Sequence, residues 1–408
     1  MLRLRDGGYS LLKLLGEGLQ WVSGMRGDPL DVAEGLMIEF AYRTGLTSGL
    51  GPRHYLWTDA FAVCNFLGLY RLRGSERFRR LALRLVDQVH YVLGRHRDDD
   101  PRDGWISGLS DEEGWRHPTV GGLRIGKRLP ERKPDEPLDE VLEWERDGQY
   151  YHYLTRWMHA LNRVSEVTGE AAYNLWAMEL AKTAHSSFVY EAPDGRKRMY
   201  WKMSIDLSRP LVESMGQHDP LEGFIVYNEL QAAAPEDPDW PSLEDESEDL
   251  AEICEGMDWE TSDPLGIGVL LWNAYALARL IGSGHLDRVD LLLDILNSSL
   301  LSLELYLVGE PTRLPASVRL PFRELGLSIG LRAATRLRGL VVDEPRLSGN
   351  GEIRSLIKSL TCYTWLIREI EGFWLRPVNR ESYSWKEHQD INMVMLATSL
   401  APDGFLGT

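Results

Sequence analysis

The stretch DGQYYHYLTRWMHAL, residues 147–161, predicts a buried helix around which the rest of the chain can be organised. Asp147 stands where an N-cap is preferred, because a carboxylate there accepts a backbone N–H and opposes the positive end of the helix dipole. His152, Arg156 and His159 fall at i, i+4 and i+7, on one helix face. Apolar side chains cover the remaining circumference, so we expect an interior helix with one ionisable stripe.

The composition of the 408-residue chain argues against two classes of partner. Its formal net charge of −17 disfavours nucleic acid and anionic membrane surfaces, because a phosphate backbone needs a basic face. Hydrophobic residues make up 43% of the chain, which is enough for a sizeable core. We therefore expect one domain spanning residues 1–408, a length that large single barrels reach.

Three features of the sequence favour a cytoplasmic location. The first residues, MLRLRDGG, lack the apolar core and the cleavage site of a secretory signal. No apolar run approaches the about 18 uncharged residues of a membrane span. The three cysteines, Cys64, Cys254 and Cys362, are far apart in apolar helical context, so we expect core residues in a reducing compartment.

Apolar helices alternate with amphipathic helices along the chain. After a short amphipathic segment at 10–22, the amphipathic helices are expected at 31–43, 76–93, 170–187, 243–254, 286–303 and 352–371. The apolar helices are expected to begin near Asp59, Gln149, Asp219, Pro264, Pro321 and His388. Such a pattern is typical of inner helices that are buried all round and outer helices that expose one face.

The links between these helices differ in length in a regular way. Links from inner to outer helices are mostly short, as at 73–74 and 168–169, whereas links from outer to inner helices are long, as at 96–146 and 188–217. If consecutive helices are antiparallel, every long loop lies at the end where the inner helices start. The sequence therefore predicts an all-α (α/α)6 toroid of six inner and six outer helices with one elaborated mouth.

Two of the long loops carry most of the irregular sequence. The turn signal PDG at 193–195 separates two alternating segments, 188–191 and 198–203, which predicts a small β-hairpin at the mouth. The loop at 96–146 is too long to be idle in a compact domain. Its candidates to cover or line the mouth are Trp105, Trp115, His117, Arg124 and Lys127.

The alternation of helices resembles the six-hairpin, (α/α)6-barrel superfamily, which holds many glycoside hydrolases, polysaccharide lyase relatives and the N-acylglucosamine 2-epimerase group. The resemblance covers most of the chain and rests on the architecture and on helix openings such as Trp57-Thr58-Asp59 and Asp147-Gly148-Gln149-Tyr150. It implies the fold and a site at the mouth, and it assigns no catalytic residue.

Residues at the starts of the inner helices converge on the mouth of such a ring, where the helix dipoles favour carboxylates and anionic ligands. The candidates for catalysis are Asp59, Asp147, His152, His218, Asp219, Glu222, His388 and Asp390. The candidates for substrate binding are Trp57, Tyr150, Tyr151, Arg124, Lys127, Trp201, Arg323 and Trp385. Protonatable groups beside aromatic faces suit carbohydrate chemistry, which needs two such groups flanking one bond.

Each candidate also has a structural interpretation. The aspartates stand where N-caps are preferred, so capping explains any one of them as well as catalysis does. A buried hydrogen bond is an alternative for His218 and Glu222, and His159 lies deep enough to be a satisfied core histidine. Individual aromatic residues are more often part of the core than of a binding surface.

The leading hypothesis is a carbohydrate-active enzyme, a glycoside hydrolase acting on a short or modified saccharide. In that hypothesis Glu222 or Asp219 is the general acid, and Asp59, Asp147 or Asp390 activates water or stabilises the developing positive charge.

Two other functions remain open. In a sugar epimerase or isomerase of the N-acylglucosamine 2-epimerase kind, His218 and His388 exchange a proton beside a carbonyl. The chain also fits a non-catalytic sugar-binding or scaffold protein, since fold does not fix function.

We expect neither a cofactor nor a metal. The segment GGLRIGK, residues 121–127, lacks the spacing and the preceding strand of a phosphate loop. No Cys-x-x-Cys or His-Glu-x-x-His pair exists, and Cys362 is followed by Tyr363 and not by histidine, which argues against zinc. The expected partner is a small saccharide, and neither nucleic acid nor membrane is expected.

Overall fold

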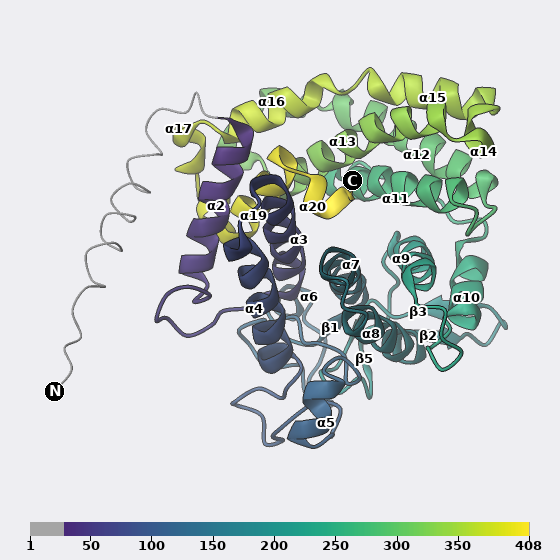
Figure 1. Cartoon of the computed structure of the whole chain (residues 1–408). Helices are drawn as coiled ribbons and strands as arrows, with labels where there is room; N and C mark the ends of the chain where they lie inside the picture. Colours follow the sequence, from purple (N-terminus) through teal and green to yellow (C-terminus); the bar gives the residue numbers. More distant parts are fainter. Residues whose placement is uncertain (1–27, 408) are drawn as a thin grey trace.

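A closed ring of six inner helices forms the centre of the molecule. The computed structural model describes residues 28–407, so the segment expected at 10–22 lies outside the described residues (Figure 1). The inner helices are α3 (Leu56–Arg73), α7 (Tyr151–Thr168), α9 (Asp219–Ala233), α11 (Pro264–Gly282), α13 (Pro321–Asp343) and α19 (Gln389–Leu400). Each packs against the next, and α19 returns to α3. The predicted all-α toroid is confirmed.

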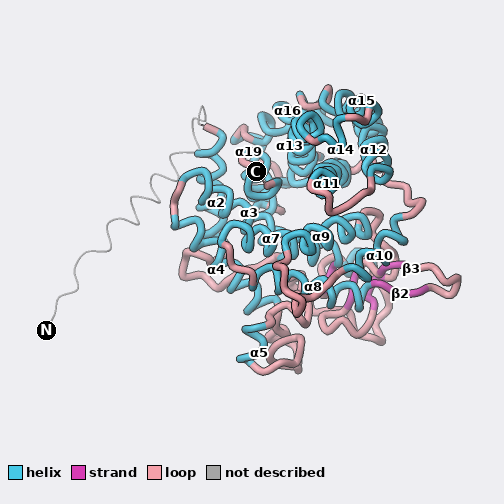
Figure 2. The backbone as a smooth tube through the Cα atoms, turned by 45° about the vertical axis from the view of Figure 1, so that its right-hand side comes forward, coloured by secondary structure: helices cyan, strands magenta, loops and turns pink. Residues whose placement is uncertain are grey.

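The outer helices pack against this ring from outside, and helices dominate the described chain throughout (Figure 2). They are α2 (Pro29–Arg43), α4 (Glu76–Leu93), α8 (Ala172–Phe188), α10 (Glu244–Cys254), α12 (Val289–Val308), α15 (Gly351–Thr361) and α16 (Trp365–Trp374). α2 covers α19, α4 covers α3 and α8 covers α7, while α10, α12 and the α15–α16 pair cover α9, α11 and α13.

The sixth outer helix differs from its prediction. The helix expected at 352–371 is divided into α15 and α16, because residues 362–364 bond to the third residue back, which tightens the chain and ends a helix. Cys362 lies at this turn and is exposed, whereas Cys64 and Cys254 are buried. The expectation of a core position is therefore wrong for Cys362.

The burial of α3 and α4 shows why inner and outer helices differ in sequence. α3 buries every residue from Leu56 to Leu69. The neighbouring outer helix buries one face only, made of Phe78, Leu81, Ala82, Leu85, Val86, Val89, His90 and Leu93. Gly74 joins the two helices with a φ of 66°, a left-handed conformation that favours glycine at a helix end.

The connections between hairpins carry the short elements. The predicted β-hairpin is confirmed as β2 (Val189–Glu191) and β3 (Lys197–Met199), which pair antiparallel. A second antiparallel sheet has the order β1 (Gln149–Tyr150), β4 (Lys202–Met203), β5 (Pro210–Val212). The short helices are α5 (Asp111–Arg116), α6 (Glu140–Glu143), η2 (Pro311–Arg313), η3 (Ala316–Val318), α14 (Pro345–Ser348), α17 (Pro377–Arg380), α18 (Tyr383–Glu387) and α20 (Asp403–Leu406). Long connections end at the starts of inner helices, and we call that end the mouth.

Three glycines bring α11 and α13 into backbone contact. A Cβ atom added at Gly268 would lie 2.3 Å from the carbonyl oxygen of Gly326, and one at Gly330 would lie 2.6 Å from the Cα atom of Gly268. Neither position tolerates a side chain without a shift of backbone, so glycine is required for this close approach.

The end of the ring opposite the mouth is closed by α20. Phe405 stacks on Phe61 with ring centroids 4.5 Å apart and meets Trp272 edge-on at 5.3 Å. The Nε of Arg163 donates to the carbonyl oxygen of Gly404 over 3.1 Å. The C-terminal segment therefore forms a floor under the mouth, and we call it the α20 floor.

Two helices of the described chain, α11 and α12, are long and apolar enough to span a membrane by composition alone. Both pack within the toroid. For the inner helix α11, 72% of the apolar window is buried, and the outer helix α12 packs against α11 and α15. Burial against neighbouring helices accounts for the apolar sequence of α11.

Candidate active site at the mouth of the ring

His152 lies in a cluster of aromatic rings at the mouth. Its ring is nearly parallel to that of Trp201, with centroids 6.1 Å apart and planes at 12°. Tyr150 is 5.4 Å away, and Tyr153 meets the histidine edge-on at 4.8 Å. The first turn of α7 carries the histidine, while Trp201 lies between β3 and β4. The structure thus brings together three residues named from the sequence, Tyr150, His152 and Trp201.

Asp219, the first residue of α9, faces His152 of the neighbouring inner helix α7. The distance from His152 Nδ1 to Asp219 Oδ1 is 3.7 Å, and the aspartate side chain is only 8% exposed. Neither His152 Nδ1 nor Asp219 Oδ2 has a hydrogen-bond partner among the described residues. A buried polar atom without a partner costs about 1–3 kcal/mol, so this pair is built to engage a further group. We call it the upper pair.

A second charged pair lies one helical turn deeper on the same two helices. Glu222 Oε1 accepts from Arg156 Nε over 2.5 Å and from Thr155 Oγ1 over 2.6 Å. Both members of the ion pair are about 95% buried. Glu222 Oε1 is therefore engaged by two donors from α7, so these contacts tie α9 to α7 and do not favour the general-acid role proposed for Glu222. We call Arg156 and Glu222 the lower pair.

Arg156 of the lower pair lines a small cavity of about 20 Å³ above the α20 floor. Arg156 stacks over the Trp272 ring at 5.3 Å. Buried donors of Arg156, Trp272 and Asn273 lack partners among the described residues. His159 also lines the cavity, with Nε2 2.9 Å from the Phe405 carbonyl oxygen and Nδ1 3.4 Å from Glu229, so it is the satisfied histidine expected there.

Two tyrosines that sequence reasoning missed complete the mouth. The hydroxyls of Tyr55 and Tyr153 form a short hydrogen bond. Burial raises the pKa of Tyr55 to about 12 and the pKa of Tyr153 well above its usual value, so both phenols remain protonated donors. Lys127 Nζ lies 5.3 Å from the Tyr55 ring, and burial lowers its pKa. The sequence offered one signal for this pair: Tyr153 directly follows His152 in the stretch 147–161.

Arg323 places a guanidinium near the same cluster. Its Nη1 lies 2.9 Å from Asp263 Oδ1, and Asp263 N-caps α11 by accepting from the Gly266 N–H over 3.2 Å. Burial raises the pKa of Tyr153, and the positive charge of Arg323 acts in the opposite direction. The Nε of Arg323 is buried and has no partner among the described residues.

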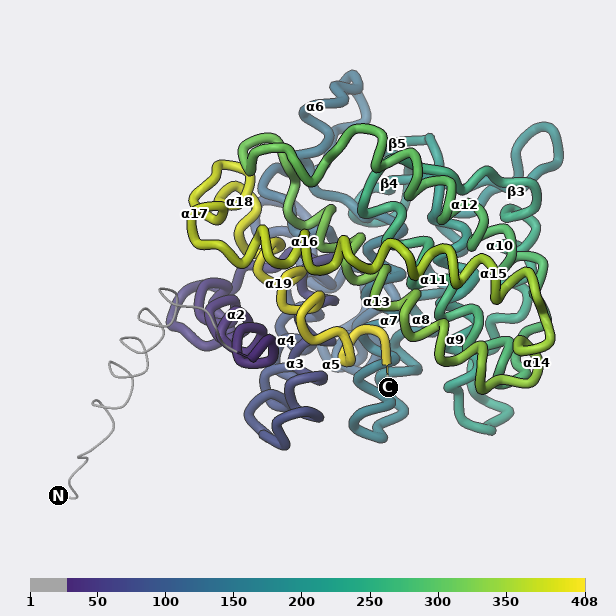
Figure 3. The backbone as a smooth tube through the Cα atoms, turned by 90° about the horizontal axis from the view of Figure 1, so that it is seen from above, coloured from purple at the N-terminus to yellow at the C-terminus, as the bar shows by residue number. Residues whose placement is uncertain are grey.

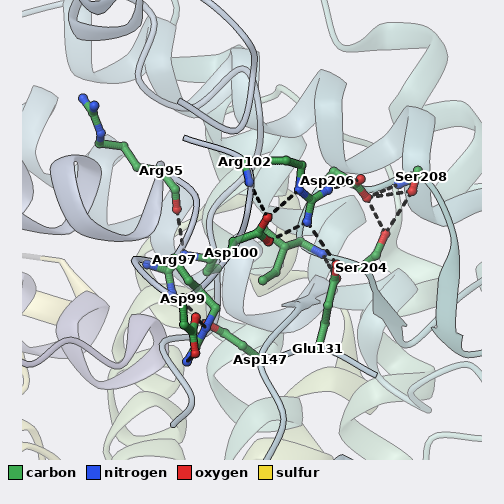
Figure 4. Close-up of polar contacts among 12 residues, drawn as sticks. Arg95, Arg97, Asp99, Asp100, Arg102, Glu131, Asp147, Ser204, Asp206 and Ser208 are labelled. Atoms are coloured by element: carbon green, nitrogen blue, oxygen red, sulfur yellow. Dashed lines mark hydrogen bonds and ion pairs between the residues drawn. The ribbon is translucent and has the colours of Figure 1, made fainter. Parts of the chain in front are cut away.

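Asp147 is not the N-cap of α7. That helix starts at Tyr151, and Asp147 lies in the preceding loop (Figure 4). Its Oδ2 accepts from Arg124 Nη1 over 2.7 Å and from Arg97 Nη1 over 3.2 Å, and Oδ1 accepts from the Gly126 N–H over 3.0 Å. The carboxylate is fully buried. The roles proposed for Asp147 in catalysis and for Arg124 in substrate binding therefore do not fit, since each holds the loop.

A network of ion pairs fixes the same loop to the sheet. Arg102 contacts Asp100, Glu131 and Asp206, which belong to three separate parts of the chain (Figure 4). Burial acts to raise the pKa of Asp206, but hydrogen bonds from Ser208 and Ser204 and the charge of Arg102 lower it to about 2, so Asp206 stays charged at neutral pH.

The other candidate carboxylates are engaged in holding helices. Burial raises the pKa of Asp59, and His54 opposes the rise, with its Nδ1 3.0 Å from Asp59 Oδ2. Asp59 also accepts from the Tyr55 N–H over 3.1 Å. Asp390 accepts from Arg43 Nε of α2 over 2.7 Å. Neither contact leads to the upper pair.

Three predicted binding aromatics have different surroundings. Tyr151 donates to the Tyr227 hydroxyl over 3.1 Å, between the inner helices and α8, so it does not face the mouth. Trp385 is 3% exposed and stacks on Trp374. Trp57 contacts Phe61 at 4.7 Å, one turn above the α20 floor. Of the three, Trp57 alone has a position inside the ring.

The two histidines proposed as an epimerase pair are placed separately. His218 Nε2 lies 3.0 Å from the Trp259 carbonyl oxygen, and burial lowers the pKa of His218. His388 precedes α19, is 38% exposed and meets the Phe322 ring edge-on at 5.6 Å. Within residues 28–407 no recorded contact joins the two histidines. His152, by contrast, lies 3.7 Å from Asp219 and stacks on Trp201.

Part of the 96–146 loop covers the outer helices instead of the mouth. His117 Nδ1 lies 2.5 Å from Glu179 of α8, and Trp115 stacks on Tyr91 of α4. Lys127 and Trp144 come closer to the mouth, since Trp144 meets Trp201 edge-on at 5.0 Å. Within the part of the chain that the structure describes, no group of three His, Cys, Asp or Glu side chains is placed to hold a metal ion.

No family model and no curated protein matches this sequence. Among solved structures, a cellobiose 2-epimerase from Spirochaeta thermophila is 13% identical, with a TM-score of 0.46 over 85% of this chain and 86% of that one. A sugar epimerase from a ruminal bacterium is 11% identical, with a TM-score of 0.46 over 95% and 98% of the two chains. An unsaturated glucuronyl hydrolase specific for heparin is 15% identical, with a TM-score of 0.31 over 67% and 84%. Values this low carry no conclusion about activity.

Proposed function

We propose that the protein is a carbohydrate-active enzyme that hydrolyses a glycosidic bond in a short or modified saccharide at the mouth of the ring. The observation that carries the proposal is the upper pair, in which buried atoms of His152 and Asp219 lack partners beside an aromatic cluster. Small-molecule sites combine apolar aromatic faces with a few convergent polar groups in this way.

The other residues of the cluster have roles that follow from their contacts. Trp201 is partly exposed and offers the face of its indole to a sugar ring, backed by Tyr150 at 4.9 Å. One of the two phenols, Tyr55 or Tyr153, donates to the other, and the proton of the accepting phenol is left to donate to a sugar hydroxyl. Arg323 adds a cation to the same side of the mouth, which suits a saccharide that carries a negative charge.

In the proposed reaction Asp219 protonates the leaving oxygen as the glycosidic C–O bond breaks, and His152 holds the position of that carboxyl group. A water molecule then adds to the anomeric carbon and returns its proton to the Asp219 carboxylate. The general acid must reach within about 2.6–3.2 Å of the oxygen it protonates. The positive charge that develops on the sugar is met by the electron-rich ring faces of the cluster.

The test is release of reducing ends from labelled disaccharides and uronides by wild type, Asp219→Asn and His152→Gln. We expect each variant to lose about 10²–10⁴-fold in kcat, the usual contribution of a positioned acid or base. Asp390→Asn is the control, because Asp390 pairs with Arg43 of the outer helix α2 and has no recorded contact with the upper pair among the described residues. Wild-type turnover in Asp219→Asn would remove the proposal.

Epimerisation of a free sugar is the second candidate, because His152 beside Asp219 is also a suitable base for a proton next to a carbonyl. Incorporation of solvent deuterium into a free sugar, without release of new reducing ends, would favour epimerisation. Saturable sugar binding with no turnover across the panel would favour a binding protein.

A further inference from the structure

A cleft of about 670 Å³ lies between α13, α16 and α20, outside the ring. Figure 3 shows α15 and α16 running end to end past the labelled C-terminus. The cleft is lined by Arg332, Thr335, Arg336, Arg338, Thr361, Thr364, Ile367, Arg368, Glu371, Pro402 and Asp403, and we call it the arginine cleft. It is formed by the second half of α13, so it lies toward the floor of the ring and away from the mouth.

We propose that the arginine cleft binds a small molecule carrying two or more phosphate charges. Helical spacing places Arg332, Thr335 and Arg336 on one face of α13, with Arg338 one turn after Thr335. Ile367, Arg368 and Glu371 share one face of α16. The lining of the cleft contains four arginines and two carboxylates, an excess of positive charge, although the net charge of the whole chain is −17. A local excess of positive charge inside a cleft attracts anions more strongly than the same charge on an open surface.

Two of the four arginines are already paired. Arg332 binds Glu371 through Nη2, at 2.8 Å to Oε1 and 2.9 Å to Oε2. Glu371 also accepts from Ser399 Oγ over 2.6 Å. Arg336 pairs with Asp403 and with the Gly407 carbonyl oxygen. These contacts fix the floor and one wall of the cleft, and they cancel two of the four positive charges.

The other two arginines are available to a ligand. Arg338 of α13 and Arg368 of α16 are exposed, and among the described residues neither has a recorded ion pair or side-chain hydrogen bond. They belong to different helices that line one cleft. A guanidinium presents two parallel N–H donors that match two phosphate oxygens, so two such groups favour a ligand with two phosphate groups over a monovalent anion.

The size and remaining lining of the cleft narrow the ligand further. Small-molecule sites have volumes of about 300–1,000 Å³, so this cleft holds more than one phosphate group. The hydroxyls of Thr335 and Thr361 already donate to backbone carbonyls, and their oxygens remain free to accept. Ligand hydroxyls can donate to them, which suits a phosphorylated polyol.

Exposed arginines without a recorded ion pair also occur outside the arginine cleft, and these provide a matched control. Arg77 and Arg80 of α4 are exposed and have no recorded ion pair among the described residues. Solvation alone explains such side chains. The double variant Arg77→Gln/Arg80→Gln removes the same charge as Arg338→Gln/Arg368→Gln and leaves the arginine cleft intact.

The experiment is isothermal titration of inorganic pyrophosphate into the full chain at constant ionic strength, with a chelator present to exclude metal complexes. We expect saturable binding to wild type and to the Arg77/Arg80 control, and at least about tenfold weaker binding to Arg338→Gln/Arg368→Gln, since charge-assisted bonds are lost. Circular dichroism checks that the double variant folds.

Three results would overturn the proposal. Equal pyrophosphate affinity in all three proteins would show that pyrophosphate binds outside the arginine cleft. Absence of saturable binding to wild type would show that the cleft holds solvent and binds no phosphate ligand. Citrate competing as well as pyrophosphate would show recognition of charge without recognition of phosphate. Because no sugar substrate enters this measurement, its outcome is independent of the activity proposed for the mouth.

Discussion

The upper pair and the lower pair are carried by the same two helices, one turn apart, yet they differ in every contact. His152 and Asp219 stand 3.7 Å apart with buried atoms left without partners among the described residues. Arg156 and Glu222 are 2.5 Å apart, and Thr155 adds a further bond to the carboxylate. The comparison teaches that two pairs on the same helices can differ in role: direct short bonds tie the lower pair together, while the wider upper pair keeps free atoms for the ligand that we propose at the mouth.

The largest expected effect comes from breaking the lower pair. Glu222→Gln leaves the Arg156 charge buried without its partner, which we expect to lower the free energy of unfolding by about 3–5 kcal/mol. Urea denaturation followed by circular dichroism measures the change. An unfolding free energy equal to that of wild type would mean that the lower pair does not hold the ring.

The matched change in the upper pair should act on activity. Asp219→Asn keeps the shape of the side chain. Because Asp219 makes fewer direct bonds in the folded protein than Glu222 does, we expect the denaturation midpoint to stay near that of wild type. The same variant should lose about 10²-fold or more in kcat. A large loss of stability with retained kcat would reverse the functions assigned to the two pairs.

Acid stability tests whether another buried group, outside both pairs, governs the fold. Burial lowers the pKa of His90 to about 3, and its Nε2 accepts from Trp157 Nε1 over 3.1 Å. Below the ordinary histidine pKa of about 6.5 the unfolded chain binds a proton that the folded chain does not, so stability falls with falling pH. Between pH 6.5 and 5 the loss should reach about 2 kcal/mol.

The measurement for His90 is the denaturation midpoint across that pH range, compared between wild type and His90→Gln. We expect a shallower pH slope in the variant, although it is less stable at neutral pH. An unchanged slope would assign the acid sensitivity to other groups.

The smallest effect concerns the donor that distinguishes the lower pair. Thr155→Val removes the hydrogen bond to Glu222 and keeps the side-chain volume, so we expect a loss of about 1.5 kcal/mol, the low end for a bond to a charged group. Thermal unfolding gives the value. Thr155 contacts the upper pair through the backbone carbonyl of His152, which lies 3.1 Å from its Oγ1, and has no recorded contact with either side chain of that pair among the described residues. We therefore expect kcat not to change, and a loss of kcat would show that the two pairs are coupled.

The ring could be predicted from the sequence because burial leaves a direct mark on it. An inner helix such as α3 must be apolar on all sides and an outer helix such as α4 on one side only, so the alternation of the two patterns reveals the architecture. The position of His152 and Asp219 at the starts of inner helices followed from the same pattern.

Contacts between distant loop residues produce no periodic pattern in the sequence, so they could not be predicted. Asp147 and Arg124 look like site residues in the sequence, but their pairing depends on a loop path that no periodicity encodes. The bond between Tyr55 and Tyr153 joins two hairpins, and the arginine cleft joins α13 to α16. The division of α15 from α16 at Cys362 was also missed, because three turn bonds outweigh the helical pattern there.

The closure of the ring has a consequence for how the protein is made. The first inner helix, α3, packs against α19 and against the α20 floor, which are translated long after it. A nascent chain therefore presents the apolar surface of α3 without its final partners throughout most of synthesis. Such surfaces are prone to aggregation, so we expect ribosome-bound intermediates of this chain to depend on chaperones more than the finished ring does.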